Sequence, residues 1–470
     1  MEFGAWALLL QIAGYVSVLD LGIQGAVGRY VAYYLADFKR KMAEDFVSSA
    51  FSILCVAAAI GFCGLAASSV YLHALFPQIP PVLLTQARIA LAIVGLGISL
   101  GLPASAFRGI LAGIERYELV TLIAAPAGLI SSAALIALAL AGYGIVALAV
   151  GFATVKLISY GAYWWVARIH GRLKINRWFI DREAAKELWS YCSSSMIWSI
   201  GMLMVSGLDV AIVARVDFAR VAAYAVCVTP ITIVAGAQNA MFRPLLQVGS
   251  RFFVSREMAR LHSLLERSTR VCLITIVLSV APVFLLSHQI LTLWLGRSYA
   301  DQATLILRLL LIGQAIRLIA TPYATLLLAT NNHRVARLPA LAEAFSNTCS
   351  AILLGLEFGA DGVACGVIVG AIVGQAMNIF YNYPRTRDVV GDGRFLVRKA
   401  IFIPLMCFIP IAFIPPVEAL PVPASLRLAL ATVCAATSLF AIWKYSMDMP
   451  ERQWLLRMMR RVGLPLQRFS

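Results

Sequence analysis

Charged residues are scarce in this sequence. Asp, Glu, Lys and Arg make up 13% of its 470 residues, while hydrophobic residues make up 61%. Soluble domains are close to half apolar and about a quarter charged, so this chain cannot hide its apolar groups in a fold that faces water. The shortage of charge excludes a soluble globular protein and predicts a membrane protein.

Cysteine gives no sign of a metal site or a disulfide framework. The nine cysteines are scattered through apolar segments without CxxC spacing, so we interpret them as small hydrophobic core residues. The sequence also contains no grouping of metal ligands, or of a nucleophile with an acid and a base, that would indicate catalysis. We therefore expect no metal, no cofactor and no enzymatic activity.

The sequence is rich in apolar runs long enough to cross a membrane. A hydrocarbon core about 30 Å thick needs roughly 20 apolar residues per helix. The first run carries Asp20 and Arg29 and has no basic start, so we interpret it as a helix and expect no cleavable signal peptide. The runs predict thirteen helices, at residues 4–34, 46–72, 86–112, 117–141, 144–168, 187–213, 218–248, 264–287, 301–328, 335–356, 361–383, 397–416 and 425–446.

Basic residues are distributed unevenly over the loops between these helices. The net charge is +16, which in a soluble protein would suggest a nucleic acid partner. Here the basic residues lie in the loops between spans, so we interpret them as signals of membrane topology and expect no nucleic acid partner. Loops after the odd-numbered helices are rich in Lys and Arg, as at 39–41 and 168–186, while the opposite loops hold little beyond Arg215, Arg220 and Arg297. Because positive loops stay in the cytoplasm, the pattern places the N-terminus outside and the C-terminus in the cytoplasm.

An internal repeat accounts for the odd number of helices. Three pairs of short segments match at one constant offset, each at the same place in the helix order. Such matches also arise by chance among Gly- and Ala-rich helices, but three at one offset favour two repeats of the same orientation. The second repeat opens with helix 187–213, so we expect the first repeat to lack its leading helix. The pairs are 4–7 with 222–225, Arg116 with Arg334, and 143–145 with 361–363.

The predicted fold is an all-α polytopic membrane protein of about 13 transmembrane helices, in two parallel lobes of five and six helices with two C-terminal helices. We expect the C-terminal tail, which carries Trp454 and several arginines, to lie on anionic membrane lipids as a basic amphipathic helix. The predicted segments are an N-terminal lobe at 1–170, a cytoplasmic linker at 171–186, a C-terminal lobe at 187–390, two additional helices at 391–448 and the tail at 449–470.

Three stretches carry a resemblance to a known superfamily. They are YVSVLDLGIQGAVGRYVA at 15–32, LDVAIVARVDFARVAAYAVCVTPI at 208–231 and LTLWLGRSYADQATLILRLLLIGQAIRLIATPYATLLLATNNHR at 291–334. With the order of helices over essentially the whole chain, apart from the leading span, the sequence resembles a multidrug/oligosaccharidyl-lipid/polysaccharide (MOP) exporter. The resemblance is to the Wzx-like polysaccharide flippase branch of that superfamily.

The resemblance implies a V-shaped bundle whose central cavity opens alternately to each side of a bacterial inner membrane. It implies that the substrate is an oligosaccharide on undecaprenyl pyrophosphate, moved to the periplasmic leaflet for O-antigen, capsule or exopolysaccharide synthesis. It also implies a monomeric transporter that acts in one pathway with a polysaccharide polymerase and a chain-length regulator.

Charged side chains inside the spans are candidate substrate contacts, because they are costly in a bilayer and usually face a cavity or a partner. Arginine suits a pyrophosphate through its permanent charge and bidentate fork. The resemblance makes helix 4–34 a cavity wall, so Arg29 is the leading phosphate contact, although it is close enough to the cytoplasmic surface to snorkel. Asp20 lies near the middle of the membrane. It either faces the cavity or an ion-pair partner, or it makes a buried structural hydrogen bond. An ideal helix places Asp20 and Arg29 on opposite faces.

Helix 218–248 is the repeat counterpart of helix 4–34 and also carries polar residues. Gln238 is the offset partner of Asp20, and Asn239 follows it. Arg243, which precedes a proline, is a second candidate anion ligand or a snorkelling interfacial residue. We include Gln238, Asn239 and Arg243 among the candidate substrate contacts.

Three further residues complete the candidate site. Arg317 lies near the middle of helix 301–328, where no short snorkelling route exists, so it is functional or ion-paired. Glu343 lies about 12 Å along its helix and is a candidate partner for an arginine or a protonation site. Asp209, at the outer end of helix 187–213, is either a gating or cation-coupling group or a solvated loop charge near Arg215.

Other functions remain open at this point. A lipid II flippase or a cation-coupled drug extruder of the same superfamily would share the fold, although the arginines favour an anionic substrate. A membrane polymerase or glycosyltransferase of the same pathway usually needs a large external loop with catalytic acids or arginines. The predicted external loops at 73–85 and 417–424 are short and almost uncharged.

Overall fold

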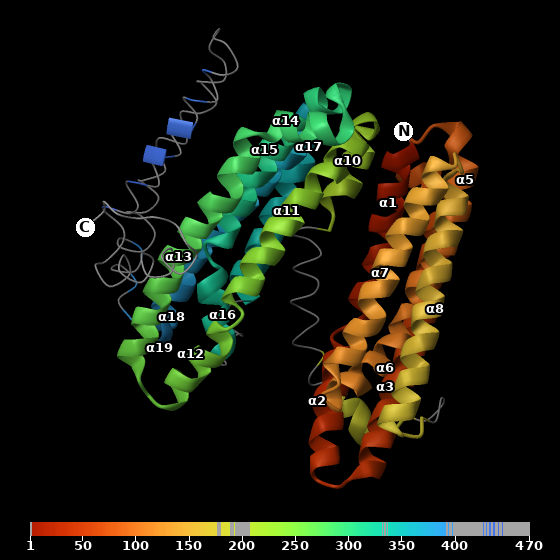
Figure 1. Ribbon diagram of the computed structural model, residues 1–470, viewed down its shortest axis with the longest axis vertical. Helices are drawn as coiled ribbons and strands as arrows, with labels where there is room; N and C mark the ends of the chain where they lie inside the picture. Colours follow the sequence, from red (N-terminus) through yellow and green to blue (C-terminus); the bar gives the residue numbers. More distant parts are fainter. Residues whose placement is uncertain are drawn as a thin grey trace, which may run out of the picture. The chain divides into compact units, whose positions relative to one another are not determined.

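The computed structural model describes residues 2–175, 180–188, 207–330 and 337–391, together with isolated positions outside these ranges. Every regular element within them is helical (Figure 1). Most of predicted helix 187–213, nearly all of helices 397–416 and 425–446, and the predicted tail lie outside the described residues.

Nine helical stretches in the described ranges are long and apolar enough to cross a membrane. They correspond to ten predicted helices, because the last stretch contains both 335–356 and 361–383. The prediction of an all-helical membrane fold is therefore confirmed. The stretches are Glu2–Leu35, Arg40–Val70, Pro81–Gly113, Tyr117–Leu140, Ile145–Gly171, Phe218–Val254, Met258–Leu285, Arg297–Ala329 and Arg337–Arg385.

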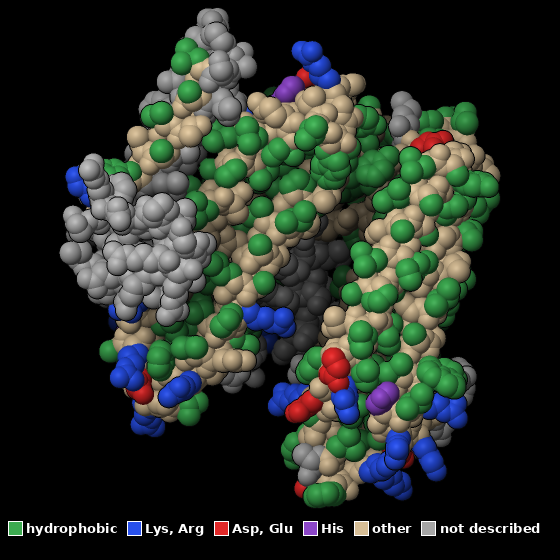
Figure 2. All heavy atoms as spheres, in the orientation of Figure 1, with side chains coloured by type: hydrophobic (Ala, Val, Ile, Leu, Met, Phe, Trp, Pro, Cys, Tyr) green, Lys and Arg blue, Asp and Glu red, His purple; other side chains and the backbone are tan. Residues whose placement is uncertain are grey.

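Helix α7 (Tyr117–Leu140) gives the most direct indication that the protein is surrounded by lipid. Its mean hydropathy reaches 2.1, and none of its residues is buried within the protein. An apolar helix without a buried face is stable only in contact with lipid. Figure 2 shows hydrophobic side chains spread along the sides of the described helices, whereas most charged side chains in this view lie near the helix ends.

Contacts divide the chain into two compact units. Unit 1 comprises Met1–Ala225 with Ala351–Val363, and unit 2 comprises Val226–Ser350 with Ala364–Ser470. The predicted lobe boundaries follow the sequence repeat instead of the contacts, and they stay a prediction.

In unit 1, helices α2 and α6 approach each other closely. Gly109 and Gly113 of α6 form a GxxxG pattern, and a Cβ at either position would lie 2.8 Å from a backbone carbonyl oxygen of α2. Small residues at this spacing let membrane helices pack backbone to backbone. This packing fixes the orientation of α2. Besides α7, the elements of unit 1 are α1 (Glu2–Gly14), the 3-10 helix η1 (Tyr15–Asp20), α2 (Ile23–Ala36), α3 (Arg40–Val70), α4 (Leu72–Leu75), α5 (Pro81–Ser99), α6 (Gly101–Gly113), α8 (Ile145–Gly171), α10 (Asp209–Val216) and η2 (Phe218–Arg220).

Unit 2 is built around two apolar clusters. One joins α11, α13 and α15 through Val234, Cys272 and Leu318. The other joins α13 and α16 to the residues after the last long helix, and it includes Tyr323 and Tyr383, whose ring centroids lie 4.8 Å apart. Helix α11 begins in unit 1, and part of α17 lies there too. The elements of unit 2 are α11 (Val221–Phe242), α12 (Leu245–Val254), α13 (Met258–Leu285), α14 (Ser287–Leu295), α15 (Arg297–Leu318), α16 (Thr321–Ala329), α17 (Arg337–Met377), the π-helix η3 (Asn378–Asn382), α18 (Tyr383–Arg385) and α19 (Arg387–Val390).

Element boundaries recur at the predicted repeat offset. Helix α3 begins at Arg40 and α13 at Met258, and these two starts are separated by the same offset as the matched sequence pairs. Phe38 and Arg256 are related by that offset too, and both have a left-handed φ of 55° just before these helices. These correspondences support the predicted repeat independently of the matching residue pairs.

Predicted helix 4–34 is observed as the apolar stretch Glu2–Leu35, but it is not one continuous α-helix. The α-helix gives way to a 3-10 helix at Tyr15, and Leu21 and Gly22 then adopt left-handed φ values of 50° and 80°. Glycine tolerates this conformation without steric cost. The chain changes direction between Asp20 and Arg29, so the ideal-helix argument about their faces does not apply.

Predicted helix 301–328 is likewise divided, at Ile319 and Ala320, into α15 and α16. Pro322 explains the interruption, because it has no N–H to donate to the carbonyl of Leu318. The thiol of Cys272 donates to this carbonyl instead, at 3.3 Å. In membrane helices, neighbouring side chains commonly satisfy backbone groups that proline leaves open.

Gly359 breaks the long helix α17 at φ 60°, ψ −138°, and a Cβ there would lie 2.9 Å from Oδ2 of Asp217. We expect Gly359→Ala to lower the free energy of unfolding by about 1–3 kcal/mol, because only glycine adopts this region readily. Unfolding of the purified protein, followed by tryptophan fluorescence, measures the effect. Gly236→Ala is the matched control, since nothing lies within 4 Å of a Cβ at that position. Equal stability of Gly359→Ala and wild type would contradict the requirement for glycine at this position.

Candidate functional site

Arg317 and Glu343 form an ion pair within unit 2. Nε of Arg317 donates to Oε1 of Glu343 at 2.6 Å, and the two side chains are 21% and 17% exposed. Because predicted helix 301–328 is divided, Arg317 lies in the last turn of α15. The partial negative charge of a helix C-terminus favours a cation there. The structure thus gives Glu343 an arginine partner, one of the two roles that the sequence left open.

Two glutamines extend this pair into a polar cluster. Nη1 of Arg317 donates to Oε1 of Gln314 at 3.3 Å, and Nε2 of Gln375 donates to a backbone carbonyl of α15 at 2.7 Å. Gly374 leaves room for the carboxylate, since a Cβ there would lie 2.6 Å from Oε2 of Glu343. The contacts connect α15 with residues on both sides of the break in α17. We call Gln314, Arg317, Glu343 and Gln375 the Arg317 cluster.

One nitrogen of Arg317 is not used by these contacts. Nη2 is buried and has no hydrogen-bond partner among the residues that the structure describes. A buried donor without an acceptor costs about 1–3 kcal/mol, and an anionic oxygen would remove that cost. The guanidinium fork matches phosphate oxygens. The Arg317 cluster therefore combines a positioned cation with a spare donor, which suits transient binding of an anion.

The candidate residues of α11 have different surroundings. Gln238 is 3% exposed, and its Oε1 accepts a hydrogen bond of 3.0 Å from Oγ1 of Thr275 on α13. Asn239 is exposed, and so is Arg243, which lies in the turn between α11 and α12. In this structure Gln238 joins two helices, whereas Asn239 and Arg243 are accessible to a ligand.

In unit 1, helix α6 positions both Asp20 and Arg29. Oδ1 of Asp20 accepts a hydrogen bond of 2.7 Å from Oγ of Ser105 on α6, which is the structural bond that the sequence left as one alternative. Gly28 of α2 faces the same helix, with its Cβ position 3.5 Å from Gly109 O. Arg29, one residue further along α2, is exposed.

Asp209 begins α10 and is only 7% exposed, so the alternative of a solvated loop charge is wrong. The side chains of Gln11 and Tyr15 both donate to the carbonyl of Gly207, each at 2.5 Å. They connect α1 and η1 to the residue two positions before α10. Arg215, at the other end of α10, donates to two carbonyls of α4 at 3.2 and 2.7 Å.

Several polar residues that sequence reasoning did not select are buried or paired. Arg270 of α13 and Asn347 of α17 are 2% and 0% exposed. The depth of Arg270, about 18 Å along α13, is a signal that could have identified it. Arg220, interpreted above only as a loop charge, binds Asp361 with both terminal nitrogens, at 2.7 and 3.3 Å.

Comparison with family models identifies the family. The model of the family described as polysaccharide biosynthesis protein matches residues 1–304. The chain belongs to this family. The matched region contains Asp20, Arg29 and Asp209 and ends before the Arg317 cluster. No curated protein matches the sequence.

Similar solved structures are transporters. The lipid II flippase MurJ in an inward closed conformation gives a TM-score of 0.69 at 14% identity, over 99% of this chain and 94% of that chain. An inward-facing MATE family multidrug resistance transporter of the MOP superfamily gives 0.68 at 12% identity, over 82% and 94%. A MOP superfamily transporter from Pyrococcus furiosus gives 0.57 at 14% identity, over 82% and 87%. This member of the polysaccharide biosynthesis family therefore has the MOP fold, as the resemblance predicted.

Proposed function

We propose that the protein is a flippase that moves an oligosaccharide linked to undecaprenyl pyrophosphate across the bacterial cytoplasmic membrane, for the synthesis of a surface polysaccharide. The observation that carries this proposal is the family match over residues 1–304. The transporter works as a monomer by alternating access, with its C-terminus in the cytoplasm. A polymerase and a chain-length regulator act on the delivered repeat unit.

Each unit, taken by itself, holds arginine donors that suit the chemistry of such a substrate. A diphosphate loses its water when it enters a bilayer, so cationic hydrogen-bond donors must replace that water. Arg29 in unit 1 and Arg243 in unit 2 are exposed, and Arg317 has an unused Nη2. The guanidinium forks of Arg29 and Arg243 suit bidentate contacts with phosphate oxygens, and Nη2 of Arg317 adds a single further donor, while the polyprenyl chain stays in the surrounding lipid.

Two carboxylates are candidates for coupling ion binding to the change of conformation. Asp209 is buried in unit 1, and Glu343 is mostly buried against Arg317 in unit 2. A carboxylate in apolar surroundings is stable only when it is paired or protonated. A change of partner at Asp209 or Glu343 would therefore be tied to a change of conformation, which is the property that a gate or an ion-coupling group needs.

A lipid II flippase is the second candidate. The MurJ structure aligns with 99% of this chain, and lipid II is another saccharide on a polyprenyl diphosphate. The two proposals share the diphosphate chemistry and differ in the group that is attached to it.

Depletion of the gene in the organism that encodes it distinguishes these proposals. We expect surface polysaccharide to be lost and the polyprenyl-linked repeat unit to accumulate, as measured by mass spectrometry of extracted lipids, with both restored by the wild-type gene. Accumulation of lipid II with arrest of cell-wall synthesis would favour the second candidate. Unchanged surface polysaccharide and unchanged lipid intermediates would contradict both.

A further inference from the structure

A pocket of about 350 Å³ lies in unit 1, between α3, α6, α8 and the segment that follows α8. The rings of Phe51, Phe107 and Trp164 line it, and the first two have centroids 5.6 Å apart. Arg168 is the basic residue on its α8 side. The pocket therefore combines an apolar aromatic wall with a permanent positive charge.

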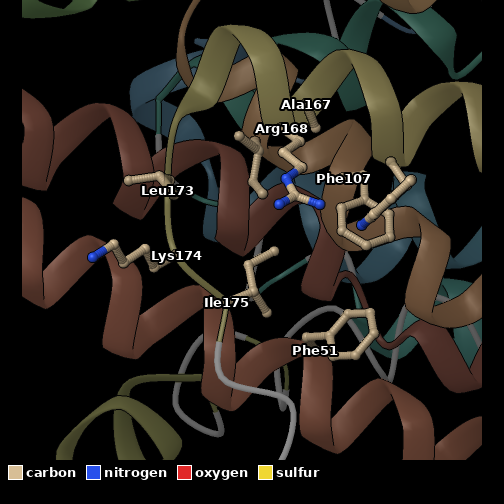
Figure 3. A pocket seen from close by; sticks show the side chains of 9 residues that line it. Phe51, Phe107, Ala167, Arg168, Leu173, Lys174 and Ile175 are labelled. Atoms are coloured by element: carbon tan, nitrogen blue, oxygen red, sulfur yellow. The ribbon is translucent and has the colours of Figure 1, made fainter.

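The side chains shown in Figure 3 indicate which cation serves the pocket. The guanidinium of Arg168 extends into the space near Phe107 and Ile175, whereas the ammonium of Lys174 extends away from it. The Arg168 guanidinium also lies 5.6 Å from the ring centroid of Trp164. Stacking on an aromatic face leaves the edge N–H groups of a guanidinium available for an anion.

The carboxylate bonded to the segment after α8 does not pair with Arg168. Oε1 of Glu44 accepts from Nε of Arg40 at 3.3 Å and from the backbone N–H of Lys174 at 3.2 Å, so this acid is already engaged. In the described part of the chain no carboxylate pairs with Arg168. The pocket is accordingly complementary to an anion.

Two tryptophans indicate the level of the pocket in the membrane. Trp164 and Trp165 lie one turn before Arg168 and are 37% and 59% exposed, with ring centroids 6.3 Å apart. Tryptophan gathers at the level of the lipid headgroups, and arginine near a helix end extends to the same level. The basic loop after α8 assigns this end to the cytoplasmic side.

We propose that this pocket binds the headgroup of an anionic phospholipid, with the phosphate on Arg168 and the glycerol region against the aromatic wall. Basic pockets between membrane helices on the cytoplasmic side are suited to such headgroups. Ligand pockets range over roughly 300–1,000 Å³. A volume of about 350 Å³ therefore accommodates a headgroup, whose acyl chains stay in the bilayer, and is too small for an oligosaccharide of several sugars. The proposal is independent of the transported substrate.

Native mass spectrometry of the full-length protein tests the site, with phosphatidylglycerol and phosphatidylcholine as probes. We expect wild type to retain phosphatidylglycerol in preference to phosphatidylcholine. Arg168→Gln should lower the apparent affinity for phosphatidylglycerol at least tenfold, because each charge-assisted hydrogen bond that is lost contributes about 1.5–3 kcal/mol. Arg168→Lys should fall between the two, since a lysine keeps the charge but loses the bidentate fork.

Arg182→Gln is the matched control. Arg182 is exposed and follows Asp181, whose backbone N–H is bonded to Ser49 of α3 at 2.9 Å, and it does not line the pocket. Its substitution removes the same charge and should leave the affinity unchanged. Equal losses in both variants, or no loss in Arg168→Gln, would overturn the proposal. Displacement of the lipid by an equal concentration of inorganic phosphate would also overturn it, because it would identify a site for a soluble anion.

Discussion

Arg317→Ala is expected to reduce transport of the lipid-linked substrate by on the order of a hundredfold, because hydrogen bonds to a charged group contribute about 1.5–3 kcal/mol each. Arg317 is the cation of a polar cluster inside unit 2, and its Nη2 is buried without an acceptor among the described residues. The variant should still insert into the membrane, since one alanine does not shorten any apolar run. Export of the surface polysaccharide in cells, normalised to the amount of membrane-inserted protein, measures the effect.

The double variant Arg317→Ala/Glu343→Ala separates substrate binding from charge neutralisation. Loss of Arg317 alone leaves a mostly buried carboxylate without its partner. The destabilisation should be about 2–4 kcal/mol, slightly below the range for fully buried pairs, because both side chains are about a fifth exposed. Removal of both groups should recover much of this stability while transport stays lost. Recovery of transport in the double variant would show that Arg317 serves only to neutralise Glu343.

Arg29→Ala is expected to have an effect on transport of similar size, with almost no effect on stability. Arg29 is exposed and lies beside, not within, the glycine contact of α2 and α6, and exposed substitutions usually change stability by less than about 0.5 kcal/mol. Arg29→Lys should retain part of the activity, because it keeps the charge. The same polysaccharide assay measures both variants.

Lys41→Ala is the control for Arg29, since Lys41 is also an exposed basic residue of unit 1. Its loss should leave transport unchanged. Transport at the wild-type level in Arg29→Ala would favour the alternative in which this arginine only snorkels to the surface.

Most of the fold in the described ranges follows from the sequence, because hydropathy alone determines which segments enter a bilayer. Predicted helix 117–141 is observed at Tyr117–Leu140, and 144–168 at Ile145–Gly171. The repeat offset also predicts where α13 begins from the start of α3. In each case one property of the sequence, the length of an apolar run or its similarity to the other repeat, is enough to predict the bounds of the helix.

Hydropathy does not locate the interruptions of helices 4–34 and 301–328, since both segments remain apolar across the break. The left-handed residue Leu21 has no sequence signature that distinguishes it from a helical leucine. Pro322 was visible in the sequence, but the break is stabilised by Cys272, which belongs to a different helix, α13. Such a partner is identified only once the helices are packed.

The candidate site was predictable in kind but not in its pairings. Intramembrane charge singled out Arg317 and Glu343, and their ion pair agrees with one predicted role for each. The hydrogen bond from Ser105 to Asp20 spans 85 residues, and the bond from Thr275 to Gln238 spans 37. Serine and threonine are common in membrane helices, so nothing in the sequence marks these two as partners.

The pocket at Arg168 could not be predicted for the same reason. Phe51, Phe107 and Trp164 come from three different helices, and each alone is an ordinary aromatic residue of an apolar span. Only their convergence around one arginine makes them a site.

Transfer of the proposed substrate across a defined membrane tests the central claim most directly. The purified full-length protein is reconstituted into liposomes that carry an undecaprenyl-pyrophosphate-linked oligosaccharide in both leaflets, and an enzyme that cannot cross the membrane then cleaves the accessible sugars. Wild-type protein should make nearly the whole pool accessible, whereas protein-free and Arg317→Ala liposomes should yield only the outer-leaflet share. If folded wild-type protein also yields only the outer-leaflet share, the protein does not move this substrate and the proposed function is wrong.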